Sequence, residues 1–370
     1  MDIPYAATYE LRDRRSFLKK ITIGTSGLIA GSLGMNGCSS NLRSAPKLGK
    51  TAKIDLGDSP VSLVAGSDRR EMVFEALSPF EEHLKNALLN KQLVIKVNCV
   101  REGYPLIATH PDALRALLDF IQPFYHRQVI IGESTASPLG TLATFDGYGI
   151  SDLTREYNVK LVELNDQPTT WHWILDQNLF PQQIRIIDTF LDPDNYMISV
   201  TRLKTHNRVL ATLSLKNVVM GSPLKIDRLK INDKQKMHAG HTTAKMINFN
   251  MFLMAHRVHP DFCILDGFEG MEGNGPSSGE PVDHRVALAG PDFVAVDRIG
   301  SELMGIPWEN IGYLQYCATA GLGQGDRSQI KIIGPNPKDH VIKYRLHENI
   351  DWQYRWKDDI ILKKMNDEET

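Results

Sequence analysis

The densest group of chemically active side chains in the sequence is the segment KTHNRVLATLSLKN, residues 204–217. It contains Lys204, His206, Lys216 and Asn217. A lysine that is near other cations or removed from water has a lowered pKa and can act as a nucleophile or base. A histidine two residues away can relay protons or bind a metal ion. We therefore expect Lys204, His206 and Lys216 to be catalytic.

Other polar residues follow short apolar runs that we predict to be strands. Lys96 and Asn98 end one run, Glu133 and Ser134 end a second, and Asp266 ends a third. Ligands bind at the carboxyl edge of the sheet in open α/β folds, so these side chains are expected to meet there. The full set of expected ligand-binding residues is Lys96, Asn98, Glu133, Ser134, Asn217, Asp266, Glu272 and Asn274.

The last two of these lie in a Gly-rich run, residues 267–279. The run lacks the G-K-[ST] ending of a phosphate-binding P-loop and does not fit G-x-G-x-x-G between a strand and a helix. We interpret it as a tight loop that brings the backbone close to a ligand, with Glu272 and Asn274 as its polar contributions. A purely structural turn is the alternative.

The lysines also allow interpretations that involve no catalysis. Lys96, Lys204 and Lys216 together would hold a phosphate or carboxylate without any reaction. Alternatively, the carboxylates of Glu133 and Asp266 satisfy them and the group is structural. Three functions therefore stay open: an enzyme acting on a small anionic or carbonyl-bearing substrate, a ligand- or metal-binding protein, and a structural or assembly role.

Short apolar runs alternate with helical patterns along the chain, which predicts an α/β fold with a mostly parallel sheet and helices on both faces. The predicted strands are residues 93–97, 128–131, 160–162, 184–187, 196–200, 262–265 and 329–333. The predicted helices are residues 111–124, 151–157, 242–257 and 293–304. We expect one domain over residues 46–350, with a large loop excursion near 207–241 and a polar C-terminal tail at 351–370.

The N-terminus resembles a targeting segment. Arg14 and Arg15 precede Ser16-Phe17-Leu18-Lys19-Lys20 and an apolar run over residues 21–33, which is shorter than the roughly 20 residues of a membrane-spanning helix. The string RRSFLKK is similar to the twin-arginine signal, although Asp13 departs from it. Residues 1–45 are therefore expected to direct a folded protein to the twin-arginine translocation machinery. A basic arm before an amphipathic helix is the alternative.

A lipid anchor is a further expectation for the same segment. Gly37-Cys38 stands where a lipoprotein signal places its acylated cysteine, although Met35 and Asn36 fit that signal poorly. The protein would then be periplasmic or attached to the outer side of the membrane, and an unpaired Cys38 is the alternative. The remaining cysteines, Cys99, Cys263 and Cys317, are far apart and argue against an iron–sulfur cluster.

Composition excludes some partners. The chain of 370 residues is 42% hydrophobic and 23% charged, with a formal net charge of -2, as expected for a globular protein. The lysines of residues 225–236 alternate with apolar and acidic residues, so we interpret this stretch as a solvated loop. We expect no nucleic-acid partner. We do expect a small-molecule ligand.

Five motifs carry a resemblance to a known family. IKVN, GESTA, RLKTH followed by TLSLKNVVMG, ILDGFEGMEGNGPSSGE and AVDRIGSELMG resemble, in this order and over residues 90–325, the domain of unknown function 362 family. The resemblance implies an α/β fold and often an exported location, but no settled activity. Some members carry a ferredoxin-like segment with clustered cysteines, which this sequence lacks.

A fainter resemblance concerns a metal. A histidine, a lysine ten residues later and downstream histidines are similar to the arrangement in the lactate racemase family, whose lysine holds a nickel pincer nucleotide. The matching positions are His206, Lys216 and either His238 or His241. Candidate metal ligands are therefore His206, His238 and His241, and the cofactor is left unknown, with a metal ion as a candidate. Loop or helix-cap roles for His238 and His241 are the alternative.

Overall fold

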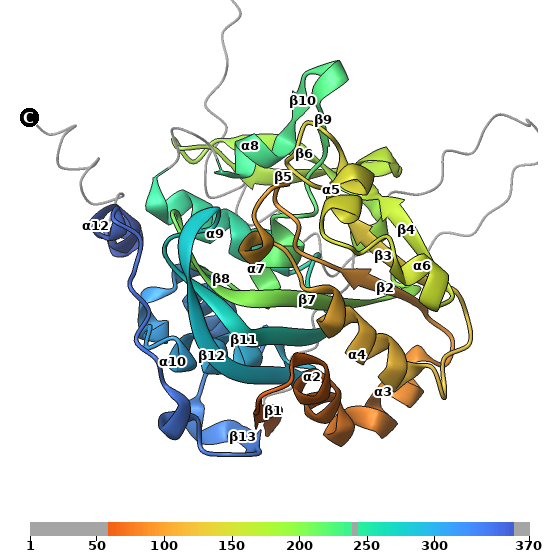
Figure 1. The fold of residues 1–370 in the computed structure, drawn as a ribbon. Helices are drawn as coiled ribbons and strands as arrows, with labels where there is room; N and C mark the ends of the chain where they lie inside the picture. The colour runs from red at the N-terminus through yellow and green to blue at the C-terminus, as the bar shows by residue number, and fades with distance from the viewer. Residues whose placement is uncertain (1–57, 239–242, 359–370) are drawn as a thin grey trace, which may run out of the picture. The chain divides into compact units, whose positions relative to one another are not determined.

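The computed structural model describes residues 58–238 and 243–358, which belong to one compact unit (Figure 1). The predicted targeting segment, Cys38 and His241 lie outside these residues. Within the described ranges, no helix combines the length and the apolar character needed to cross a membrane.

A mixed sheet of nine strands forms the centre of the fold. Its order is β13-β1-β12-β11-β7-β2-β3-β4, with β8 paired to β7. The strands are β1 (Ser59–Ala65), β2 (Gln92–Lys96), β3 (Val129–Glu133), β4 (Val159–Glu163), β7 (Asn195–His206), β8 (Leu210–Thr212), β11 (Phe262–Asn274), β12 (Ser278–Gly290) and β13 (Ile330–Ile333). The run from β11 to β4 is parallel, whereas β12 is antiparallel to both of its neighbours. The predicted mostly parallel sheet is confirmed.

Helices cover both faces of this sheet. Figure 1 shows α2 (Arg69–Leu77), α3 (Glu81–Leu88) and α4 (Pro111–Ile121) below the sheet, and α7 (Ser214–Val219) and α9 (Ala244–Ala255) above it. The remaining helices are α5 (Thr141–Gly147), α6 (Leu153–Glu156), α8 (Asp233–His238), α10 (Phe293–Leu303), α11 (Gly312–Thr319) and α12 (Ile350–Tyr354).

The side chains of β7 show how the sheet supplies two cores. Met197 and Leu203 join the apolar cluster that includes α7, α9 and α10, whereas Ile198 and Val200 join the cluster under α2 and α4. Because successive residues of a strand point to opposite faces, one continuous apolar run is buried on both sides.

The excursion predicted near residues 207–241 is folded, which corrects that expectation for its described part. It contains β8, α7, a small hairpin of β9 (Lys225–Ile226) and β10 (Ile231–Asn232), and α8. Val209, Leu213 and Val218 are fully buried. Burial of these apolar residues stabilises the segment against the sheet, so it is part of the core and not a loop.

β11 is longer than the sequence predicts, and this changes the interpretation of the Gly-rich run. β11 continues to Asn274 and forms a hairpin with β12, in which Glu272 faces Glu280. The run is therefore a strand and a turn, a correction explained by close packing, and of its described residues Pro276 in the turn lines the pocket described below. A Cβ added at Gly270 would lie 2.0 Å from the Tyr344 hydroxyl oxygen, so glycine is required there.

The predicted strand at 184–187 belongs to a separate hairpin of β5 (Thr169–Leu175) and β6 (Pro181–Ile187).

The C-terminal tail begins with α12, where the Gln353 side chain accepts a hydrogen bond from the Leu210 amide at 2.6 Å. The tail is thus packed as far as residue 358.

Candidate functional site

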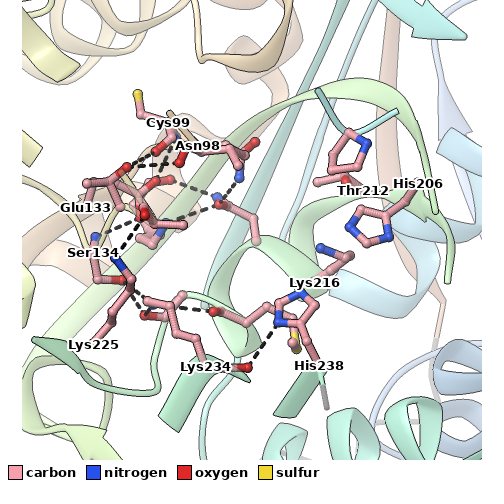
Figure 2. A pocket seen from close by; sticks show the side chains of 18 of the residues that line it. Asn98, Cys99, Glu133, Ser134, His206, Thr212, Lys216, Lys225, Lys234 and His238 are labelled. Atoms are coloured by element: carbon pink, nitrogen blue, oxygen red, sulfur yellow. Dashed lines mark hydrogen bonds and ion pairs between the residues drawn. The ribbon is translucent and has the colours of Figure 1, made fainter. Parts of the chain in front are cut away.

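A pocket of about 340 Å³ lies where β2, β3 and β7 end (Figure 2). Its other walls come from α7, α8 and the turns beside them. The predicted site residues that line it are Lys96, Asn98, Glu133, Ser134, His206, Lys216, Asn217 and His238. The structure therefore brings together side chains from strand ends that are far apart in the sequence, as expected for this sheet edge.

Glu133 anchors one side of the pocket. Its carboxylate lies 2.6 Å from the Lys96 ammonium and accepts hydrogen bonds from the backbone amides of Cys99 and Ser134, both at 2.7 Å. Lys96 and Glu133 are 1% and 3% exposed. A buried ion pair with its remaining acceptors satisfied holds both groups rigidly.

The side chain of Asn217 accepts a further hydrogen bond from Lys96 and links it to Asn98. Its Oδ1 accepts from Lys96 Nζ at 3.2 Å and from Asn98 Nδ2 at 3.0 Å. Its Nδ2 donates to the Lys96 carbonyl at 3.1 Å and to Ser199 Oγ at 3.0 Å. Every polar group of this amide is used, so Asn217 positions its neighbours.

Lys204 lies behind this network and outside the pocket lining. Its amine donates to Asn98 Oδ1 and to the Ile107 carbonyl, the latter at 2.9 Å. Burial, followed by the charge of Lys216, lowers its pKa to about 7. Because its amine is used by these two acceptors, Lys204 positions Asn98. The predicted direct contact of Lys204 with a substrate is therefore replaced by a positioning role.

Lys216 differs from the other lysines of the site. It is 6% exposed and faces the pocket from α7. Its amine makes no hydrogen bond or ion pair with any residue in the described ranges. Burial, followed by the nearby charge of Lys96, lowers its pKa to about 7. A large fraction of this amine is therefore neutral near pH 7.

Both ends of α7 are held by buried polar side chains, which fixes the position of Lys216. At the start, the buried Asp297 of α10 accepts from the amides of Ser214 at 2.8 Å and Leu215 at 3.0 Å. At the end, the Lys234 amine donates to the Gly221 carbonyl at 2.7 Å. These contacts satisfy backbone groups that a helix leaves free.

Lys234 was missed by the sequence reasoning, which treated residues 225–236 as a solvated loop. In the structure Asp233, Lys234 and Met237 are buried on α8. Lys234 also donates to Ser134 Oγ at 2.9 Å, and burial lowers its pKa to about 7. The one available signal was the four-residue spacing of Asp233 and Met237, which is typical of one helix face.

The Asp297 contact gives a stability prediction. Asp297→Ala leaves two buried backbone amides unsatisfied, so we expect a loss of about 2–3 kcal/mol in the free energy of unfolding. Asp68→Ala is a matched control, because Asp68 caps the start of α2 at the surface and should cost about 1 kcal/mol. Equal losses for the two variants, measured by denaturant unfolding, would contradict the anchoring role.

Two histidines complete the side of the pocket around Lys216. The His206 and His238 ring centroids are 6.4 Å apart. Burial, followed by the charge of Lys216, lowers the pKa of His238 to about 3 and that of His206 well below its usual value. Both rings are therefore neutral at pH 7. Thr212, which sequence reasoning also missed, has a buried hydroxyl without a hydrogen-bond partner in the described residues.

Three predicted ligand-binding residues are elsewhere. Asp266 pairs with Arg69 of α2 at 3.1 Å, because β11 carries it to a different part of the sheet. Glu272 and Asn274 accept from the backbone amides of Arg345 at 2.9 Å and Glu348 at 3.3 Å. The expectation that Asp266 neutralises site lysines is therefore wrong, and Glu133 alone has that role among the described lining residues.

Two of the three predicted metal ligands lie in the described pocket. His206 and His238 share the pocket, and His241 lies outside the described residues. Among the side chains that the structure describes, no group of three or more His, Cys, Asp or Glu is placed to hold a metal ion. Cys99, Cys263 and Cys317 are buried free thiols.

The fold and site define an α/β protein with a lysine- and histidine-lined pocket at the ends of parallel strands. Residues 93–302 match the family described as "Domain of unknown function (DUF362)", and the chain belongs to that family.

Two individual proteins are similar to this chain. A thylakoid-associated protein of Synechocystis sp. is 24% identical over 196 residues, which cover 53% of this chain and 57% of that protein. The chain thus spans little more than half the length of that relative. A crystal structure of a Thermotoga maritima protein aligns with 14% identity and a TM-score of 0.39, covering 70% of this chain and 59% of that one.

Proposed function

We propose that this protein is an exported enzyme that acts on a small anionic or carbonyl-bearing substrate, with Lys216 as its reactive amine. One observation carries the proposal: Lys216 is buried in the pocket, yet its amine has no partner among the described residues. By contrast, Lys96, Lys204 and Lys234 each donate to at least two acceptors. An amine that faces a pocket and is not used by the described residues is available to a ligand.

The charge of the pocket supports an anionic ligand. Among the described residues that line it are four lysines, namely Lys96, Lys216, Lys225 and Lys234, and one carboxylate, that of Glu133. Lys96 pairs with Glu133 and Lys225 with Asp227, both at 2.6 Å, so an anion entering this pocket gains attraction from the protonated forms of Lys216 and Lys234. Above pH 7 the neutral fraction of Lys216 is in addition a nucleophile, which favours an enzyme over a simple anion-binding protein.

Amine acylation tests the proposed reactivity. At pH 8 we expect Lys216 to be acylated at least about tenfold faster than the exposed Lys160, because burial lowers the pKa of Lys216 to about 7 and most of its amine is neutral there. The measurement is a short pulse of acetic anhydride followed by peptide mass spectrometry from pH 6 to 10. A profile that rises with a midpoint near pH 7 is expected. A Lys216 profile that parallels that of Lys160 would contradict the proposal.

Export is the second part of the proposal and rests on the RRSFLKK motif. Changing both Arg14 and Arg15 to lysine should leave the protein in the cytoplasm, because the pair is no longer read although its charge is kept. Fractionation of cells compares this variant with a control in which Lys19 and Lys20 are both changed to arginine, which keeps the arginine pair intact. Undiminished export of the first variant would contradict twin-arginine targeting. Cys38→Ser would release the protein from membranes if Cys38 carries a lipid.

A ligand- or metal-binding protein is the second candidate, including a nickel-pincer-type enzyme. The observation that favours it is the presence of His206, Lys216 and His238 in one pocket. Elemental analysis of the full chain purified from its exported location separates the candidates. Stoichiometric metal that is lost in His238→Ala would support the second candidate over the first.

A further inference from the structure

The hydrogen bonds of His206 fix which of its ring nitrogens carries the proton. Its Nδ1 lies 3.0 Å from the backbone amide of Arg208 and accepts its hydrogen bond. A ring nitrogen that accepts an N–H has no proton of its own, and a neutral imidazole carries its single proton on the other nitrogen. His206 therefore has Nε2–H as its free group, which can only donate.

His238 has the opposite arrangement. Its Nδ1 lies 3.1 Å from the Lys234 carbonyl, and a carbonyl oxygen can only accept. Nδ1 of His238 therefore holds the proton, and its Nε2 has a free lone pair that can only accept. The two imidazoles thus offer groups of opposite kind.

Lys216 is near both rings, because its charge helps to lower the pKa of each. Figure 2 shows Lys216 on the same side of the pocket as the imidazoles of His206 and His238, with Thr212 beside His206. A nucleophilic amine that shares a pocket with a proton acceptor and a hydrogen-bond donor has the groups that addition to a carbonyl requires. The donor stabilises the oxygen on which negative charge develops.

We propose that Lys216 forms an imine with a small anionic aldehyde or ketone such as a 2-oxo acid, an inference that rests on the proposed function. The Nζ lone pair forms a bond to the carbonyl carbon, and the C=O π electrons move to the oxygen, which His206 Nε2–H stabilises. His238 Nε2 takes a proton from the amine and returns it to that oxygen. His238 Nε2 then takes the second proton from nitrogen and delivers it to the hydroxyl. The C–O bond breaks, the nitrogen lone pair forms the C=N bond, and amine and carbonyl have become imine and water.

The pocket favours this nucleophile over the nearby thiol. Cys99 also lines the pocket, but burial raises the pKa of its thiol, and its Sγ therefore stays protonated. The substrate carboxylate is attracted by the protonated form of Lys234, which has no carboxylate partner among the described residues, because Glu133 is already bound to Lys96 and two backbone amides. Both features restrict the reaction to Lys216 and the substrate to a small anion.

Reductive trapping tests the imine. The full chain is incubated with glyoxylate and sodium cyanoborohydride, and the adduct is located by peptide mass spectrometry. We expect one stable adduct, on Lys216, that is lost in Lys216→Arg and kept in the surface control Lys160→Arg. His206→Phe should slow trapping about 10²-fold, because it removes the donor to the carbonyl oxygen.

The same samples separate failure of this inference from failure of the proposed function. Protection of Lys216 from acetic anhydride by glyoxylate, without any trapped adduct, would overturn the imine and keep the anion-binding enzyme site. Neither adduct nor protection would overturn both. If His206→Phe does not fold, the ring protons of the wild-type chain provide the test by ¹⁵N NMR. Protonated Nε2 in His206 and protonated Nδ1 in His238 are expected, and the reverse assignment would overturn the proposal.

Discussion

Lys216→Met is expected to abolish ligand binding and turnover while leaving the fold intact. Methionine retains most of the side chain's volume and apolar stem but removes the amine that no described residue binds. The affinity of the full chain for glyoxylate or phosphate, measured by calorimetry, should fall by at least about tenfold. Thermal unfolding in the same buffer reports on the fold.

The same variant has an expected effect on stability with a definite sign. The pKa of Lys216 is lowered from 10.5 to about 7 by folding, so between these pH values the unfolded chain binds more protons. The contribution of Lys216 therefore destabilises the protein below pH 7 and disappears as the pH rises towards 10.5. Lys216→Met should accordingly be at least as stable as the wild type at pH 6. Lys160→Met is the surface control, and a Lys216→Met protein that unfolds would show that the lysine is structural.

Glu133→Ala is expected to cost about 3–5 kcal/mol of unfolding free energy, the usual penalty for removing one partner of a buried ion pair. The substitution leaves the Lys96 ammonium buried without its counter-ion and frees two backbone amides. Denaturant unfolding at pH 7 measures the loss, and ligand binding should disappear with it because Lys96 lines the pocket.

An exposed ion pair supplies the matched control for Glu133. Glu82 pairs with Lys85 at 2.9 Å but its side chain is 80% exposed, so Glu82→Ala should cost less than about 1 kcal/mol. Replacing both members of the buried pair, as Lys96→Met with Glu133→Leu, should recover much of the lost stability. A Glu133→Ala protein as stable as the Glu82→Ala protein would contradict the anchoring role of the pair.

The sequence was informative where strands are fully buried. Apolar, β-branched runs predicted β2, β3, β4, β7 and β11 in place, and the polar residues at the ends of β2 and β3 proved to line one pocket. β12 was missed because its segment SGEPVDHRVALAG mixes Pro281 and charged residues with its apolar positions. Its pairing with β1 and β11 outweighs this low strand propensity.

The errors in the site came from contacts between distant segments. Asp266 was placed near the lysines by its position after a predicted strand, but β11 continues past it and Arg69 binds it. The charged neighbours of Lys234 predict a solvated loop, but in the structure α8 directs its side chain inward to the end of α7. No local pattern contains this information, since each contact depends on how helices pack onto the sheet.

The ionisation of Lys216 tests the central claim most directly. The full chain, with lysines labelled by ¹³C at Cε, can be titrated by NMR beside the Lys216→Arg variant, which identifies the resonance. We expect one lysine signal with a midpoint near pH 7 that is missing from the variant and moves to higher pH when an anion binds, because a bound negative charge favours the ammonium form. A Lys216 signal that titrates near 10.5 and ignores added glyoxylate and phosphate would contradict the account.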